Sequence, residues 1–160
     1  NNSLVKEWKP HTRKIFFINC VKRNGNSYLI SCSRDGKSIV NNISEGTSQT
    51  VSHGIRGYAS YASLDADARF LITSSTRDNN IFIWDLQHQL ELLPLSKHEE
   101  PITKTIFHKN GLIVSSSQDG TVRLWHSFQW DSIKLQVNQT DLKKEQATQL
   151  KILSGWLQEK

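Results

Sequence analysis

Serine, histidine and aspartate, the residue types of a nucleophilic catalytic triad, recur together along this sequence. In a triad, one histidine takes a proton from one serine beside an oxyanion hole, and one aspartate orients the histidine. Here a histidine precedes an aspartate by 24, 25 and 21 residues at three places: His11 and Asp35, His53 and Asp78, His98 and Asp119. Because the trio repeats, whereas an active site occurs once, we interpret it as a structural device.

The other residues that could do chemistry predict no reactive site. His88, His108 and His126 have neither a second histidine four residues away nor a Cys-x-x-Cys companion, which a zinc site would need. The eight glycines are scattered and form no phosphate-binding loop. We therefore expect no catalytic residue, no metal, no cofactor and no enzymatic activity.

The aspartates lie in three copies of one sequence unit, at residues 28–43, 70–86 and 112–127. Each copy has an apolar run, a Ser/Thr cluster, an aspartate followed by Gly or Asn, and then alternating apolar residues. Six residues after the second and third aspartates stands a tryptophan, Trp84 and Trp125, whereas the first copy has Asn41 there. Asp-Gly supplies the residues of a tight hairpin turn, and alternation with period two indicates strands. We expect about four short strands in each unit.

A repeat of 41 to 43 residues with an early histidine, an aspartate at a hairpin and the pair Trp84-Asp85 resembles the WD40 repeat. The resemblance covers about residues 3–138 and implies an all-β, partial WD40-type β-propeller. The expected domain, residues 1–138, has the outer strand of a preceding blade at 3–8 and three four-stranded blades at about 11–52, 53–97 and 98–138.

In that family a histidine, a strand serine or threonine, the aspartate and the tryptophan form a hydrogen-bonded chain that staples each blade. The resemblance carries this role to His11 and Asp35; to His53, Ser74 or Thr76, Asp78 and Trp84; and to His98, Ser115 or Ser117, Asp119 and Trp125. Asn41 has no indole N–H to complete the first chain. We expect the first blade to be the least stable.

Three blades leave both ends of the array uncovered, because propellers have about four to eight. Either further blades lie on the same polypeptide or another chain completes the ring. The sequence has no methionine, which favours a piece of a longer polypeptide.

Family propellers commonly bind partners on the face where the second and third strands of each blade turn. Carried over by position, the expected face comprises Lys14, Phe16, Arg34, Arg56, Tyr58, Arg77, Pro101, Thr103 and Gln118. Four cations beside two aromatics suit an acidic or phosphorylated protein segment, because arginine makes forked contacts with carboxylate and phosphate. The alternative is that these cations only solvate a surface.

The formal charge of +5 also suits nucleic acid, but no basic run exceeds two residues. We therefore predict a scaffold subunit of a multiprotein complex, with a nucleic-acid-associated role in RNA processing or ribosome assembly as the alternative. No apolar run is long enough to cross a bilayer, and the F-R-R-G motif of phosphoinositide-binding propellers is absent. Two cysteines are too few for a disulfide scaffold, which favours an intracellular, cytoplasmic or nuclear location.

Helical periodicity begins at Thr140, so residues 139–160 are expected to form an amphipathic α-helical tail. Its expected contacts come from one side of the helix: Leu150, Leu153, Trp156 and Leu157. The tail either packs on the propeller or binds a groove of a partner.

Overall fold

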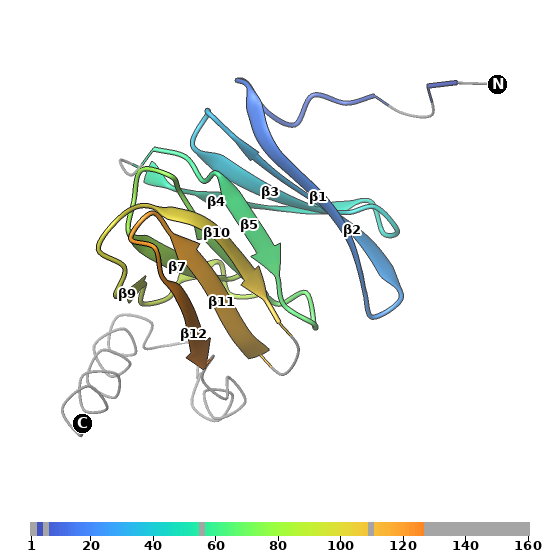
Figure 1. Ribbon diagram of the computed structural model, residues 1–160. Helices are drawn as coiled ribbons and strands as arrows, with labels where there is room; N and C mark the ends of the chain where they lie inside the picture. The colour runs from blue at the N-terminus through green and yellow to red at the C-terminus, as the bar shows by residue number, and fades with distance from the viewer. Residues whose placement is uncertain (1–2, 5–6, 55–56, 109–110, 127–160) are drawn as a thin grey trace, which may run out of the picture. The chain divides into compact units, whose positions relative to one another are not determined.

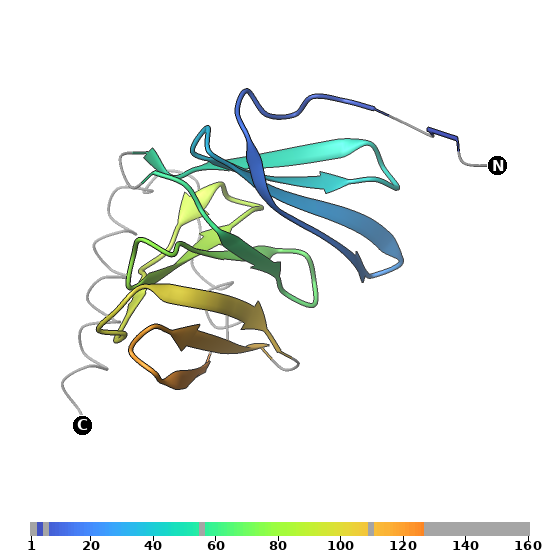
Figure 2. The same ribbon diagram turned by 45° about the horizontal axis from the view of Figure 1, so that its top comes forward.

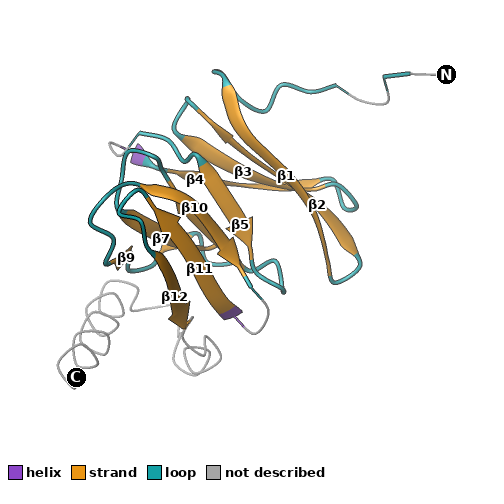
Figure 3. Ribbon diagram, viewed as in Figure 1, coloured by secondary structure: helices purple, strands orange, loops and turns teal. Residues whose placement is uncertain are grey.

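The computed structural model describes residues 3–4, 7–54, 57–108 and 111–126, which form three antiparallel sheets (Figures 1 and 3). The all-β class predicted from the alternating pattern is confirmed for this part of the chain. The expected helical tail at 139–160 lies outside the described residues. Within them, no helix is long and apolar enough to cross a membrane.

The first sheet contains β1 (Ile15–Arg23), β2 (Asn26–Ser33), β3 (Lys37–Asn42) and β4 (Thr47–Ser52) in sequence order. The turn between β2 and β3 depends on Gly36, whose φ of +80° favours glycine. A Cβ at Gly36 would lie 3.0 Å from the carbonyl oxygen of Gly57, so the turn also packs closely against the second sheet's leading loop.

The second sheet is built on β5 (Tyr61–Leu64), β6 (Phe70–Ser74) and β7 (Asn80–Asp85). Two short strands, β8 (Leu90–Glu91) and β9 (Leu95–Ser96), both pair with β7. The outer strand of this sheet is therefore interrupted. Every residue of β6 is buried, because the sheet lies between the first and third sheets (Figure 2).

The third sheet has three described strands, β10 (Ile102–Phe107), β11 (Leu112–Ser117) and β12 (Val122–His126). The fourth strand expected before residue 138 lies outside the described part of the chain. At the other end, residues 3–8 were expected to include a strand, but Ser3, Leu4, Glu7 and Trp8 are not in one and residues 5–6 are not described. An outer strand needs a neighbouring strand for its hydrogen bonds, and the described residues provide none there.

The apolar core lies between neighbouring sheets, because each sheet can bury its faces only against another. Between the first and second sheets it contains Ile30, Cys32, Val40 and Val51 on one side and Ala59, Ala62, Leu64, Leu71, Phe82, Trp84 and Leu86 on the other. Two side chains also cross this junction to backbone carbonyls. Arg23 Nε donates to Asp65 O at 2.8 Å, and Gln49 Nε2 donates to Leu86 O at 3.0 Å.

Candidate protein-interaction face

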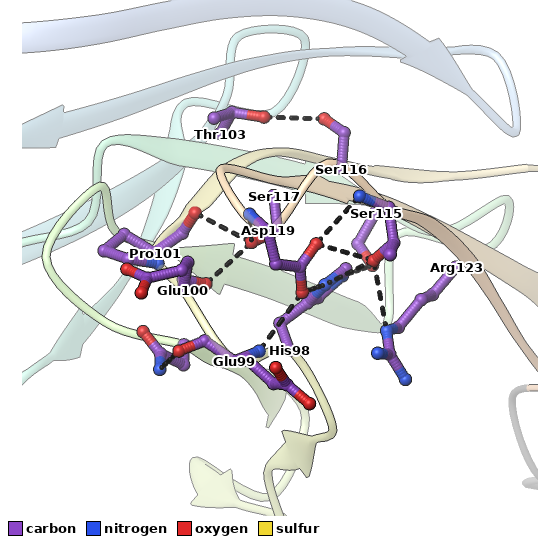
Figure 4. A network of polar contacts seen from close by, with 12 residues as sticks. His98, Glu99, Glu100, Pro101, Thr103, Ser115, Ser116, Ser117, Asp119 and Arg123 are labelled. Atoms are coloured by element: carbon purple, nitrogen blue, oxygen red, sulfur yellow. Dashed lines mark hydrogen bonds and ion pairs between the residues drawn. The ribbon is translucent and has the colours of Figure 1, made fainter.

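A chain of side-chain hydrogen bonds runs through the third sheet, and Figure 4 shows the part of it around His98 and Asp119. Trp125 Nε1 donates to Ser115 Oγ at 2.8 Å, and Ser115 Oγ lies 2.8 Å from His98 Nε2. His98 Nδ1 in turn lies 2.8 Å from Asp119 Oδ2. A carboxylate only accepts, so Nδ1 carries the proton and Nε2 accepts from the serine hydroxyl. Every group in the chain then donates to the next.

In this hydrogen-bonded series the Ser115 hydroxyl has no access to a substrate. The residue is 1% exposed, and its hydroxyl already joins an indole and an imidazole. Desolvation raises the pKa of Asp119, but hydrogen bonds from Thr121, from His98 and from the Thr121 and Glu99 amides outweigh it, so the pKa lies below its ordinary value. The ionised carboxylate therefore holds the loop before β10 against the β11–β12 turn.

The first sheet repeats this hydrogen-bonded arrangement but has no tryptophan in it. His11 Nδ1 lies 3.0 Å from Asp35 Oδ2, and His11 Nε2 lies 2.9 Å from Ser31 Oγ. Desolvation raises the pKa of Asp35, but donation from the Thr12 amide and from His11 lowers it below the usual value. At the tryptophan position, Asn41 Nδ2 is buried and has no hydrogen-bond partner in the described part of the chain.

The acceptor in the second sheet is Thr73, not Ser74 or Thr76 as expected. Trp84 Nε1 donates to Thr73 Oγ1 at 2.8 Å. Alternate residues of a strand point to opposite faces, so Ser74 points the other way and its hydroxyl lies 3.1 Å from Thr105 Oγ1 in the third sheet. The second copy has one more residue between Thr73 and Asp78 than the other two copies have between the corresponding serine and aspartate.

His53 and Asp78, expected to bond to each other, each contact a further group. His53 Nε2 lies 2.8 Å from Ser38 Oγ of the first sheet, and Asp78 Oδ1 accepts from the Asn80 amide at 2.9 Å. The His53 ring also lies edge-on to Trp84, with ring centroids 5.4 Å apart. In this copy the histidine therefore joins two sheets.

The turns beside these networks position the residues predicted to bind a partner. The Arg34 amide donates to Lys14 O at 2.8 Å, and Ser33 Oγ donates to Arg13 O at 3.0 Å. These bonds fix the segment before β1 against the β2–β3 turn. Lys14 and Arg34 consequently lie side by side, and both are exposed.

Four of the nine predicted face residues form one contact series, which we term the cation–aromatic ladder: Lys14, Phe16, Tyr58 and Arg77. The Phe16 and Tyr58 rings stack with centroids 4.8 Å apart and planes 16° from parallel. Lys14 Nζ lies 5.4 Å from the Phe16 ring centroid, and Arg77 Cζ lies 5.4 Å from that of Tyr58. These distances are within the range of cation–π attraction. The ladder therefore links the first sheet to the second.

Of the other predicted face residues, Arg34 lies beside Lys14 of the ladder. In the third sheet, the Gln118 amide donates to Pro101 O at 3.0 Å, and Thr103 Oγ1 lies 2.8 Å from Ser116 Oγ. Arg56 lies outside the described residues, as do the tail residues Leu150, Leu153, Trp156 and Leu157.

A polar cluster around the buried Asp85 in the second sheet was not predicted from the sequence. Asp85 Oδ2 accepts from Arg69 Nη2 at 3.1 Å and lies 2.9 Å from His88 Nδ1, while Oδ1 accepts from the Gln87 and His88 amides. Desolvation raises the pKa of Asp85, but these donors lower it below its usual value. An aspartate ending a strand is a signal for such a turn.

Comparison with known proteins identifies the repeats. The family model described as WD domain, G-beta repeat matches residues 48–85 and 90–126. A probable coatomer subunit beta′ of Schizosaccharomyces pombe is 30% identical over 135 residues, covering 81% of this chain and 16% of that protein. Residues 48–85 and 90–126 are therefore WD40 repeats. The resemblance to WD40 repeats predicted from the sequence is thus confirmed.

Other WD40-repeat comparisons agree with this assignment. A p21-activated protein kinase-interacting protein 1-like of Gallus gallus is 29% identical over 92 residues, covering 56% of this chain and 25% of that protein. The chain thus spans a quarter or less of these two curated relatives. The solved structures of U3-55K and of the RRP9 WD40 repeats give TM-scores of 0.61 and 0.62 at 18% and 19% identity, over 74% of this chain and 37% of each of those chains. This likeness shows the WD40 propeller fold.

Proposed function

We propose that this WD40 segment is a non-catalytic, intracellular scaffold that binds an acidic or phosphorylated protein segment at the cation–aromatic ladder. The ladder is the observation that carries the proposal. It presents stacked aromatic rings between two cations, with Arg34 beside Lys14. Aromatic residues and arginine are enriched where protein interfaces concentrate their binding energy.

The ladder suits an acidic segment because its cations are already held in place. Stacking on the rings restricts Lys14 and Arg77, so less side-chain entropy is lost when they meet a carboxylate or phosphate. The lysine provides a point charge and the arginines provide planar forks. Two curated relatives have names that state an assembly or an interaction, as a coatomer subunit and as a kinase-interacting protein, which accords with a scaffold role.

The buried polar chains support a structural role for the repeated Ser, His and Asp residues. His98 and Ser115 are both buried, and Ser115 already joins an indole and an imidazole. A nucleophile and its base must reach a substrate. Their burial accordingly favours the scaffold over an enzyme.

The proposal is tested by fluorescence anisotropy with a labelled peptide of alternating glutamate and phosphoserine. Reversing Arg34→Glu and Arg77→Glu together is expected to weaken binding at least tenfold, because each lost charge-assisted contact contributes about 1.5–3 kcal/mol. The matched control is Lys22→Glu with Lys104→Glu, which changes the same net charge at two exposed residues outside the predicted face.

Equal loss in both double variants would show that only net charge matters, and would overturn the ladder as a site. A single-stranded RNA of equal charge provides the second arm of the experiment. RNA binding that exceeds peptide binding and falls steeply with salt would favour the alternative, a nucleic-acid-associated protein.

A further inference from the structure

An open cleft of about 250 Å³ lies where the first sheet meets the second. Its walls come from β2, from the β3–β4 hairpin and from the β5–β6 turn, and every residue that lines it is described. The β3–β4 turn follows β3, whereas the β2–β3 turn beside the cation–aromatic ladder precedes it, so the two turns lie at opposite ends of that strand. The cleft is therefore a separate feature from the ladder.

The lining combines apolar walls with a single charge. Tyr28 and Ala68, both half-buried, provide apolar surface. Glu45 is the only charged residue among the eight that line the cleft. The cation that follows Ala68 in the sequence, Arg69, is not among them, and its guanidinium is already paired with Asp85 at 3.1 Å. The cleft is therefore complementary to a positive charge on an apolar stem.

Hydrogen bonds around the β3–β4 turn hold the charge of Glu45 in place. Asn26 Nδ2 donates to Glu45 Oε1 at 2.8 Å. The Ser44 and Glu45 amides donate to Asn42 Oδ1 at 3.1 and 3.2 Å, which fixes the backbone of the turn. Within the described part of the chain, no hydrogen bond is made to Glu45 Oε2. One carboxylate oxygen is thus engaged, and the other is available to a ligand.

The wall from the second sheet is fixed as well. Ala68 has a φ of +58°, a left-handed conformation that residues other than glycine rarely adopt. Asp65 Oδ1 holds this turn by accepting from the amides of the two residues that follow Ala68, at 2.8 and 2.9 Å. Gln49, which also lines the cleft, bonds across the junction to Leu86 O. Fixed walls reduce the entropy that is lost when a ligand binds.

We propose that this cleft binds a lysine side chain from a basic segment of a partner protein. The lysine stem packs along Tyr28 and Ala68, and its ammonium group meets Glu45 Oε2. Lysine side chains bury their stems on apolar surface while the charged end stays near water, as an exposed carboxylate at the edge of a half-buried cleft requires. This inference goes beyond the acidic-partner face and involves other residues.

The size of the cleft and the state of its carboxylate decide the class of ligand. Pockets for small molecules measure roughly 300–1,000 Å³, so a cleft of about 250 Å³ suits one side chain better than a free metabolite. Arginine binds a carboxylate best as a planar fork on both oxygens, whereas lysine is a point charge. Because Asn26 already takes Glu45 Oε1, the remaining single oxygen favours lysine.

Fluorescence anisotropy with a labelled peptide of alternating lysine and serine tests the proposal. The chain has a net charge of +5, so nonspecific attraction of a cationic peptide is disfavoured. Glu45→Gln keeps the acceptor for Asn26 but removes the charge, and is expected to weaken binding about fivefold, the effect of losing one exposed ion pair. The matched control is Glu100→Gln, at an exposed carboxylate outside the cleft, which is expected to bind like the unaltered chain.

A second variant and two further peptides test the shape and chemistry of the site. Ser48→Phe fills the cleft at an exposed position without changing its charge, and is also expected to weaken binding. Circular dichroism checks that each variant folds. Peptides with acetyl-lysine or arginine in place of lysine are expected to bind more weakly.

Three results would overturn the proposal. The first is a lysine peptide that does not bind the unaltered chain at any soluble concentration. The second is Glu45→Gln binding no more weakly than Glu100→Gln, which would show that the cleft carboxylate is not the contact. The third is equal binding of the arginine or acetyl-lysine peptide, which would show that the cleft does not select lysine.

Discussion

Phe16 and Tyr58 come from different repeats, yet their rings stack at 4.8 Å and form the centre of a surface flanked by Lys14 and Arg77. Stacked pairs contribute about 0.5–1.5 kcal/mol beyond the area they bury. In a double-mutant cycle of Phe16→Ala and Tyr58→Ala, we expect the free energies of unfolding to be non-additive by that amount. Urea unfolding measures the cycle. Strict additivity would show that the contact contributes nothing to stability.

Asn41 and Asn42 are neighbours with opposite expected responses to the same substitution. Asn41→Leu removes a buried unpaired donor and is expected to stabilise the chain by about 1–3 kcal/mol. Asn42→Leu is expected to destabilise it, because Asn42 Oδ1 accepts from the Ser44 and Glu45 amides. Thermal unfolding of both variants distinguishes the two effects. A destabilised Asn41→Leu would show that Asn41 has a partner in solution.

The carboxylates of Asp35, Asp85 and Asp119 make stability dependent on acid. Desolvation raises the pKa of each carboxylate, but its hydrogen bonds lower the pKa by a larger amount. The folded-state pKa therefore lies below the unfolded value of about 3.9. The unfolded state then binds more protons, so this stabilisation is complete above that value and is lost as pH falls through the folded-state pKa. Asp65 acts in the opposite sense, because burial raises its pKa.

We expect Asp119→Asn to destabilise the chain more at neutral pH than near pH 3, since the amide cannot carry the charge that is lost in acid. Urea unfolding from about pH 6 down to about pH 3, which brackets the unfolded-state pKa, measures the difference between variant and parent. A difference that stays constant with pH would contradict the assignment of this carboxylate as an ionised acceptor.

Two cysteines differ in their expected reactivity. Cys20 is exposed, whereas Cys32 is buried, and burial raises its pKa to about 12 against the opposing hydrogen bond from Ser38. The thiolate is the reactive form, so a thiol reagent at about pH 8 is expected to label Cys20 alone in the folded chain. Intact mass spectrometry counts the labels, and urea should expose the second site. Rapid double labelling without urea would contradict the burial of Cys32.

Local patterns along the chain were enough to predict the repeats and the strand class. Asp-Gly turns and period-two alternation are local signals, so the hairpins at Gly36 and Gly120 and the all-β class could be predicted. The resemblance to WD40 repeats also predicted the pairs His11–Asp35 and His98–Asp119, whose side chains lie within hydrogen-bond distance.

The partner that each side chain meets depends on how the strands and sheets pack. One extra residue in the second copy moves the acceptor to Thr73 and leaves Ser74 facing the third sheet, because strand residues alternate between faces. His53 turns to Ser38 of another sheet, and Phe16 reaches Tyr58 across the junction. Such contacts join distant segments, so their geometry depends on how the sheets pack, and local sequence patterns do not contain it.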